Sequence, residues 1–406
     1  MAIFGSGMSA APAAVDATRV ATDEASKAFG GTLPKLALVL ASPSYPDVGE
    51  VQATIQKHLG SSVVVVGGTS GGGVFGTTGI ARVGVSVVLL GGDDIEVVTR
   101  VTRFTSPTLI EAVPAAESVA EAAGEAAKRG FVHYACIVFA PGMMVDGEAL
   151  VAAIRKGAGA HAQLAGGLTG DDFTMDRPTV FIDGTQRKDH VVLAGIFSKN
   201  PIGIAARHGW RPVGPVRRIT GIDGVHLTEL DGRPALDVWL EDARRAGASI
   251  PAARGDIALY LANHYELGIV QTRSVETGNG DRELVARAPF SLRDDGAVQL
   301  SASISEGTHV RLLHATREDL MRASEDAAKA AARAVGGPVS GALLFACSGR
   351  LAALGDEFPR EPAAIQAALG APIGGACVFG EIVRNVRDAD AFFNTTAVVV
   401  AFSAEP

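Results

Sequence analysis

Apolar runs of strand length alternate with helix-like stretches along the chain, and three pairs of runs share one pattern. In each copy an apolar run ends in Ala, a helix-like stretch places Ile five residues before Gly, and a Gly-Gly pair follows. The first runs span 36–41, 136–140 and 343–346, and the glycine pairs are Gly67-Gly68, Gly166-Gly167 and Gly374-Gly375. Each copy predicts a strand–helix–strand crossover with parallel strands, so an internal repeat organises the chain.

Further patterns predict the elements between these copies. After each of the first two glycine pairs we expect an antiparallel hairpin, formed by 83–90 with 95–104 and by 179–182 with 191–197. Asp47 is positioned to cap the helix of the first copy. Other helices are predicted over 14–29, 106–128, 234–245 and 316–335, and strands over 216–220, 225–230, 257–262, 268–274, 284–288, 298–303 and 396–402.

These elements predict an α/β fold. We expect two domains built from repeated strand–helix–strand units followed by antiparallel hairpins, with mixed sheets covered by helices. Residues 1–34 form an N-terminal lead with a possible helix, 35–205 the first domain and 206–406 the second.

Composition narrows the function classes. The 406 residues are 47% hydrophobic and 20% charged, which is typical of a globular protein. The 36 basic and 44 acidic residues include no long Lys/Arg block, so neither nucleic acid nor an anionic membrane surface is an implied partner. The apolar runs are too short for membrane insertion. An odd count of three cysteines and the lack of a signal-peptide pattern favour a cytoplasmic location. No Cys and His share metal-ligand spacing, so we predict no metal and no cofactor.

The repeat predicts where a ligand would bind. In a parallel crossover both strands end at the same sheet edge, where α/β proteins tend to bind ligands, and glycines allow close backbone approach. The candidate ligand-binding residues at this edge are Thr69 and Ser70 in copy one, Gly166, Gly167, Thr169 and Asp171 in copy two, and Cys347, Ser348, Arg350, Gly374, Gly375 and Glu381 in copy three.

The edge of the third copy has the largest number of charged or nucleophilic side chains. Arg350 could hold a carboxylate and Glu381 an ammonium group, which would suit a zwitterion such as an amino acid. Alternatively, Arg350 and Glu381 pair with each other. A Gly-rich stretch at 67–73 lacks the Lys-Ser/Thr end of a phosphate-binding loop, so a tight turn is the favoured interpretation.

Two other functions stay open. Cys347, close to Arg350, could be the nucleophile of a thiol-dependent hydrolase or transferase, but no histidine lies within a repeat edge to act as its base. We therefore assign no catalytic residue. The other alternative is a non-catalytic interaction scaffold that docks partners through the helix expected at 14–29.

Several motifs resemble one known family. The second half, with Phe345-Ala346-Cys347-Ser348-Gly349-Arg350, Gly380-Glu381-Ile382 and Asn394-Thr395, resembles the FIST C-terminal domain. The first half, with Gly67-Gly68-Thr69-Ser70 and Gly166-Gly167-Leu168-Thr169-Gly170-Asp171-Asp172, is similar to its FIST N-terminal partner. The resemblance covers roughly residues 33–404.

The resemblance implies a sensory module that binds a small ligand, such as an amino acid or small carboxylate, and signals through a separate protein. It adds Asn394 to the ligand-binding candidates. The chain departs from the family pattern at Gly68 and Gly73, where Cys and an acidic residue are common, and at Phe393, where His is expected. Copies two and three are therefore the better candidates for the site, copy three above all.

Overall fold

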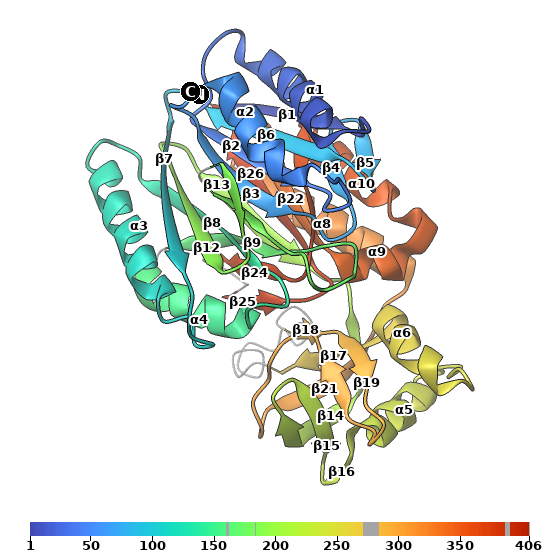
Figure 1. Cartoon of the computed structure of the whole chain (residues 1–406). Coiled ribbons are helices and arrows are strands. Elements are labelled where there is room, and N and C mark those ends of the chain that lie inside the picture. Colours follow the sequence, from blue (N-terminus) through green and yellow to red (C-terminus); the bar gives the residue numbers. More distant parts are fainter. Residues whose placement is uncertain (160–161, 183, 271–283, 386–389, 406) are drawn as a thin grey trace.

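Three six-stranded mixed sheets form the body of the protein, and an antiparallel sheet forms a lobe beside it (Figure 1). The computed structural model describes residues 1–159, 162–182, 184–270, 284–385 and 390–405. Helices cover the outer faces of the body sheets, while their inner faces pack against one another. The α/β class with mixed sheets and helical layers is therefore confirmed.

The first sheet has the order β1-β6-β2-β3-β10-β11. Its outer face is covered by α1 (Ala14–Ser26) and α2 (Val51–Leu59), which share a buried apolar cluster with it. The strands are β1 (Ile3–Ser9), β2 (Leu36–Ala41), β3 (Val64–Thr69), β6 (Val85–Gly91), β10 (Val180–Ile182) and β11 (Thr185–Arg187).

The second sheet has the order β25-β24-β9-β8-β12-β7, with α3 (Ala112–Ala127) and α4 (Gly147–Ala158) on its outer face. Its strands are β7 (Ile95–Arg103), β8 (His133–Pro141), β9 (Gln163–Thr169), β12 (His190–Ser198), β24 (Glu381–Arg384) and β25 (Asp390–Phe393).

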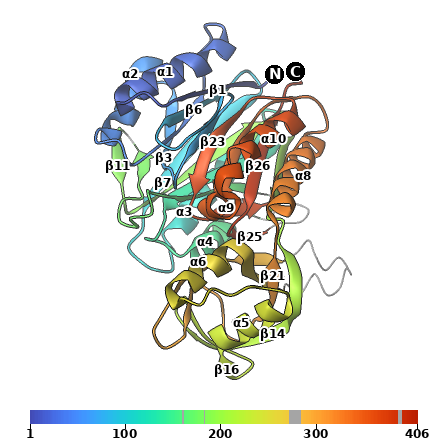
Figure 2. The same ribbon diagram turned by 90° about the vertical axis from the view of Figure 1, so that its right-hand side faces the viewer.

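The third sheet has the order β13-β26-β22-β23-β4-β5. Figure 2 shows α8 (Arg317–Val335), α9 (Ser348–Leu354) and α10 (Arg360–Leu369) along its outer side. Its strands are β4 (Val74–Gly76), β5 (Gly79–Ala81), β13 (Ile202–Arg207), β22 (Val339–Cys347), β23 (Ile373–Val378) and β26 (Ala397–Ser403). The helix expected at 316–335 is confirmed, since Thr316 and Asp319 form a capping box and Gly336 ends the helix in the left-handed conformation.

The parallel pairing predicted for each copy is confirmed. β2 pairs with β3, β8 with β9 and β22 with β23, all in parallel. The registers align Val39 with Gly67, Val138 with Gly166, and Leu344 with Gly375. Gly375, the second glycine of the third pair, is thus the counterpart of the first glycine in the other two pairs.

The glycine pairs lie inside strands and not in ligand-facing loops, which corrects the expectation for Gly67-Gly68, Gly166-Gly167 and Gly374-Gly375. Gly67, Gly166 and Gly375 have φ of 150°, 134° and 155°. A Cβ on them would lie 1.7, 2.1 and 1.9 Å from a carbonyl oxygen of the neighbouring strand. These glycines therefore permit close strand packing, because any side chain would collide with backbone.

A short hairpin follows each glycine-bearing strand and joins a different sheet. β4-β5 adds to β23, β10-β11 to β3, and β24-β25 to β9, so the three sheets exchange hairpins cyclically. The predicted domains, 35–205 and 206–406, therefore share sheets in both directions. The two hairpins expected at 83–104 and 179–197 are wrong, because β6 and β12 pair within their own sheets and not with the strands proposed.

The N-terminal lead is part of the body. β1, which the sequence pattern did not reveal, pairs along its length with β6, and the expected helix begins at Ala14. Gly5 and Gly7 let α1 approach closely, since a Cβ there would lie 2.1 and 2.0 Å from helix carbonyl oxygens. Asp47 accepts from the backbone N–H groups of Ala14 and Val15, so it caps α1 and not α2 as expected.

The lobe precedes the third copy and is inserted between β13 and α8. A few residues join β1 to α1 and β7 to α3, whereas residues 208–316 separate β13 from α8. Its sheet has the order β18-β17-β21-β14-β15-β20-β19, and α5 (Ala235–Arg245) and α6 (Arg254–His264) pack against it. The strands are β14 (Arg211–Asp223), β15 (His226–Leu230), β16 (Arg233–Pro234), β17 (Tyr265–Ile269), β18 (Val285–Arg287), β19 (Pro289–Leu292), β20 (Val298–Leu300) and β21 (His309–His314).

Most predicted elements of the lobe are confirmed, and one is wrong. The β14–β15 hairpin and helix α5 occur where the pattern placed them. The strand expected at 257–262 is instead α6, in which Ile257 and Leu261 are buried one helical turn apart. The part of the strand predicted at 268–274 that falls on 271–274 lies outside the described residues.

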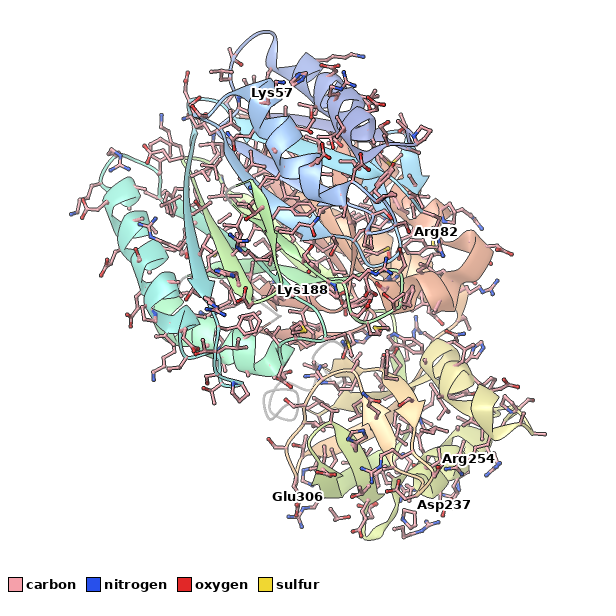
Figure 3. The ribbon with its side chains drawn as sticks, in the orientation of Figure 1. Lys57, Arg82, Lys188, Asp237, Arg254 and Glu306 are labelled. Carbon is pink, nitrogen blue, oxygen red and sulfur yellow. The ribbon has the colours of Figure 1, made fainter. Side chains whose placement is uncertain are left out.

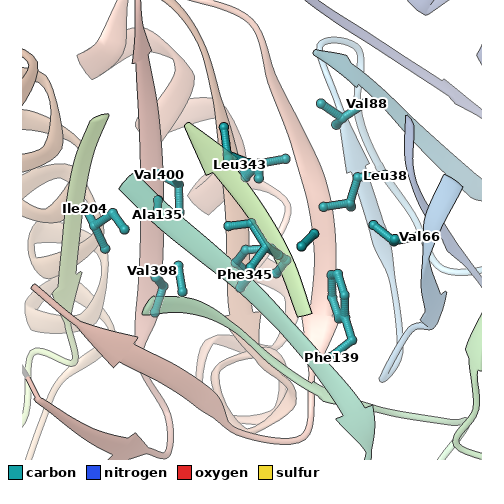
Figure 4. Close-up of a cluster of buried hydrophobic side chains, with 14 of the residues drawn as sticks. Leu38, Val66, Val88, Ala135, Phe139, Ile204, Leu343, Phe345, Val398 and Val400 are labelled. Atoms are coloured by element: carbon teal, nitrogen blue, oxygen red, sulfur yellow. The ribbon is translucent and has the colours of Figure 1, made fainter. Parts of the chain in front are cut away.

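The core lies where the three sheets face one another. Figure 4 shows Leu38 and Val66 of the first sheet, Phe139 of the second, and Phe345 and Val398 of the third in one buried cluster. The Phe139 and Phe345 rings meet edge to face, with centroids 5.7 Å apart. Strands covered on both faces read as continuous apolar runs, which explains the uninterrupted patterns in the sequence.

Candidate functional site

The ends of the three parallel strand pairs meet at one point. Gly71 N–H donates to the Cys377 carbonyl (2.8 Å), Gly170 N–H to Thr69 (3.0 Å), and Phe379 N–H to Leu168 (2.8 Å). Gly71, Gly170 and Phe379 each follow the equivalent strand glycine by four residues. The three copies therefore close a ring of backbone hydrogen bonds around equivalent positions.

One aromatic ring fills this meeting point. Where two copies have Gly71 and Gly170, the third has Phe379, and a Cβ on either glycine would lie 2.9 or 3.0 Å from the Phe379 ring. A Cβ on Gly142 would lie 3.1 Å from the same side chain. The Gly-rich loop at 67–73 is thus explained in part by the space that Phe379 needs, consistent with the interpretation as a tight turn.

A cavity of about 1000 Å³ lies beside Phe379, between the body and the lobe. Several large apolar side chains in its wall are unusually exposed: Phe173 is 48% exposed and Leu259 62%. Its body wall includes Met143, Met144, Phe173, Met175, Cys347, Ser348, Phe379, Asn394 and Thr395, and its lobe wall includes Arg254, Leu259, Asn263, Phe290 and Ser301.

Four residues of the body wall have left-handed backbone. The φ angles are 62° at Met143, 63° at Phe173, 63° at Met175 and 50° at Thr395. Residues other than glycine adopt this conformation only when their surroundings hold them there, and such strain concentrates at functional sites. The wall is therefore held in place by tertiary contacts and not by local preference.

Asp171 holds the segment that carries Phe173 and Met175. Its Oδ2 accepts from Thr174 Oγ1 and from the backbone N–H groups of Asp176 and Arg177, each at 3.0 Å. Burial alone would raise the pKa of Asp171, but these hydrogen bonds outweigh it and the pKa is lowered. Asp171 does not line the cavity; it positions side chains that do.

Two of the third-copy candidates reach the cavity wall. Cys347, 6% exposed, and Ser348 both line it. Burial raises the pKa of the Cys347 thiol well above its usual range, and the neighbouring Glu381 carboxyl raises it further. Cys347 is therefore a protonated thiol at neutral pH. The single hydroxyl hydrogen of Ser348 is used within the protein, since Oγ lies 2.6 Å from the carbonyl oxygen of Gly71 and 3.0 Å from that of Val378.

Glu381 lies behind this wall. It is fully buried, and its Oε2 accepts from Thr396 N–H at 3.1 Å. Burial raises the pKa of Glu381 well above its usual range. The cavity lining includes Cys347 but not Glu381, so a ligand in the cavity would not touch this carboxyl group directly.

Arg350 has neither of the roles that the sequence suggested. It is fully buried and pairs with Glu361 of α10, to which its Nε donates at 2.8 Å, and not with Glu381. Its Nη1 donates to the carbonyl oxygens of His208 (3.0 Å) and Thr395 (2.9 Å). Its Nη2 donates to Leu320 O and Ser324 Oγ, both at 2.8 Å. These bonds use the donors of the guanidinium group, so Arg350 is left out of the proposed ligand contacts.

The candidates from the first two copies support the loops. Thr69 Oγ1 accepts from Thr179 N–H at 2.9 Å, and Thr169 Oγ1 donates to Ala140 O at 3.4 Å. Ser70 is fully buried, and its Oγ has no partner within the described part of the chain. Thr69, Ser70 and Thr169 do not line the cavity.

Sequence reasoning missed most of the cavity wall. Phe173, Met175 and Met143 lie in short loops after strands, where exposed apolar residues would have been the signal. Asn263 and Arg254 lie on α6, which was predicted to be a strand. Figure 3 shows Arg254 on the lobe, and its sequence position lies outside all three repeat copies.

Two family models together match most of the chain. Residues 35–233 match the FIST N domain and residues 235–384 the FIST C domain. Uncharacterized proteins of Mycobacterium bovis and Mycobacterium tuberculosis are 30% identical over 207 residues, which is 48% of this chain. The chain spans about half the length of these curated relatives.

Two solved structures are similar over most of the chain, but only distantly. A cyanuric acid hydrolase from A. caulinodans gives a TM-score of 0.36 at 11% identity, covering 99% of both chains. A chorismatase gives a TM-score of 0.32 at 7% identity, covering 91% of this chain and 93% of that one.

Among the described helices, none combines the length and apolar character needed to span a membrane.

Proposed function

Because the chain belongs to the FIST family, we propose that it is a sensory protein that binds its ligand in the cavity between body and lobe. FIST domains are generally sensory domains for small ligands in signalling. The cavity is the observation that carries the proposal. Half-exposed apolar side chains gathered around one concave space, with a few polar groups among them, are typical of a small-molecule site.

The ligand class expected from the sequence is an amino acid or small carboxylate. Since the donors of Arg350 are used elsewhere, the guanidinium group available to a carboxylate is that of Arg254 in the lobe wall. Its Nη2 donates to the carbonyl oxygens of Arg293 (2.8 Å) and Asp294 (3.3 Å). These bonds orient the side chain, and its Nε and Nη1 donate to no group among the described residues, so they can meet a ligand.

The proposal also includes a signalling partner and a location in the cell. The ligand-bound protein would act on a separate signalling protein, and its location would be the cytoplasm. Cys136, Cys347 and Cys377 are all free and buried, which is compatible with a reducing compartment.

A thermal-shift screen with amino acids and small carboxylates tests the proposal. Binding to the native state raises Tm, by an amount that grows with ligand concentration. We expect a carboxylate-dependent shift that Arg254→Ala removes and Arg233→Ala, an exposed lobe arginine outside the cavity, retains. If no compound shifts the wild-type protein, the proposed function is wrong; if Arg254→Ala keeps the full shift, the carboxylate contact is wrong.

A further inference from the structure

We propose that the ligand carries a planar aromatic ring that packs on Phe173 and Phe379, with a hydrogen-bond acceptor turned toward Asn394. This inference rests on the proposed function, because it names the ligand class of the same cavity. It is compatible with a carboxylate at Arg254, but it does not depend on one.

The two phenylalanines form a preformed aromatic surface. Their ring centroids lie 5.7 Å apart with the planes tilted by 39°, and both line the cavity. Phe379 is fixed against Gly71, Gly142 and Gly170, while Phe173 is 48% exposed. Aromatic rings gain more from stacked or edge-to-face contact with another ring than from equal aliphatic area. The exposed Phe173 ring therefore favours an aromatic partner.

The surroundings of this surface support a flat apolar group. Met143 and Met175 line the same wall, and thioether sulfur atoms pack well against ring edges. Asp171 holds Phe173 and Met175 in left-handed backbone before any ligand arrives. A preorganised site loses less conformational entropy on binding, so the hydrogen bonds of Asp171 favour affinity.

Asn394 supplies a donor that lacks a partner. Its side chain lines the cavity although the residue is only 2% exposed. Its Oδ1 accepts from Ser301 Oγ of the lobe at 2.7 Å, but Nδ2 donates to no group within the described ranges. Nδ2 is therefore a donor open to the cavity, where an acceptor on the ligand can bind it and fix the orientation of the ligand.

Benzamide and cyclohexanecarboxamide provide a matched pair of probes, with the same carboxamide on a flat or a puckered ring. We expect NMR titration of the full chain to give about 3–10-fold tighter binding for benzamide, the range typical of an aromatic pair. Phe173→Leu should abolish this preference by keeping the apolar volume but not the ring. Phe104→Leu, outside the cavity, should leave it unchanged.

The acceptor is tested separately. Asn394→Asp removes the amide donor with little change in shape, and we expect it to weaken acetophenone, which offers an acceptor but no donor, about 3–10-fold while leaving toluene binding unchanged. Equal affinity for the two carboxamides, or a preference that survives Phe173→Leu, would overturn the inference. If an amino acid or carboxylate still raises Tm in a way that depends on Arg254, the proposed function stands even though the aromatic-ring inference fails. Binding of the matched probes with no such shift supports the aromatic site and contradicts the carboxylate contact.

Discussion

Breaking the buried Arg350–Glu361 pair should destabilise the protein strongly even when no ligand is present. Both side chains are fully buried, and Arg350 also donates to three carbonyl oxygens and one hydroxyl oxygen, those of His208, Thr395, Leu320 and Ser324. Arg350→Ala would leave the Glu361 carboxylate without its partner and these acceptors without donors. Removal of one member of a buried ion pair typically costs about 3–5 kcal/mol.

Urea denaturation of the ligand-free protein measures this loss. Tryptophan fluorescence is a suitable signal, because the buried Trp210 and Arg350 share a partner. The indole N–H of Trp210 donates to Thr395 Oγ1, and Arg350 donates to the backbone carbonyl of Thr395. The matched control is Arg322→Ala, which breaks an exposed ion pair with Glu318 in α8 and should lose only about 0–1 kcal/mol.

A double mutant separates the ion pair from a general packing defect. Replacing both partners, as in Arg350→Met with Glu361→Leu, removes the unpaired carboxylate and should recover part of the loss. The reasoning is refuted if Arg350→Ala loses no more free energy of unfolding than Arg322→Ala. It is also refuted if the double mutant loses the sum of the single losses, since the pair would then have no coupling energy.

Three further predictions concern pH and the cavity wall. Burial raises the pKa of Glu266 to about 8. The contribution of protonated Glu266 to the free energy of unfolding is therefore full below about pH 4.5 and is lost as pH rises toward 8. Glu266→Gln should remove this pH dependence, which amounts to about 4 kcal/mol of unfolding free energy over that window when measured by urea denaturation. Gly71→Ala should lower Tm because its Cβ would lie 2.4 Å from Ser348 Oγ, whereas Gly124→Ala, in open space on α3, should raise stability by about 1 kcal/mol; equal effects would contradict this packing argument. Asp171→Ala should cost about 1–3 kcal/mol and weaken any cavity ligand by releasing the Phe173 segment, and unchanged protease sensitivity of that segment would contradict the positioning role.

Local patterns in the sequence were sufficient for much of the secondary structure. The three parallel strand pairs, the capping box of α8 and the helix α5 follow from apolar periodicity, capping residues and glycine stops. These features depend on residues close together in the chain, so their physical causes are visible in the sequence. The same signals failed for α6, where a short apolar run fits either a helix or a strand.

The candidate site was predicted only in part. The sequence predicted that the two strands of each copy end at one sheet edge, and two residues expected there, Cys347 and Asn394, line the cavity. It could not reveal that Arg350 pairs with Glu361, because Glu361 lies on a different helix and reaches it only through tertiary packing. An arginine that binds a ligand and an arginine in a buried ion pair cannot be told apart from the sequence alone.

The arrangement of the sheets was decided by tertiary structure alone. Each short hairpin could pair with any exposed strand edge, yet the three hairpins exchange cyclically among the sheets and bring Gly71, Gly170 and Phe379 together. The insertion of the lobe then creates the cavity. Local patterns set which residues form strands and helices, but the choice among distant partners depends on burial and backbone hydrogen bonding in the whole fold.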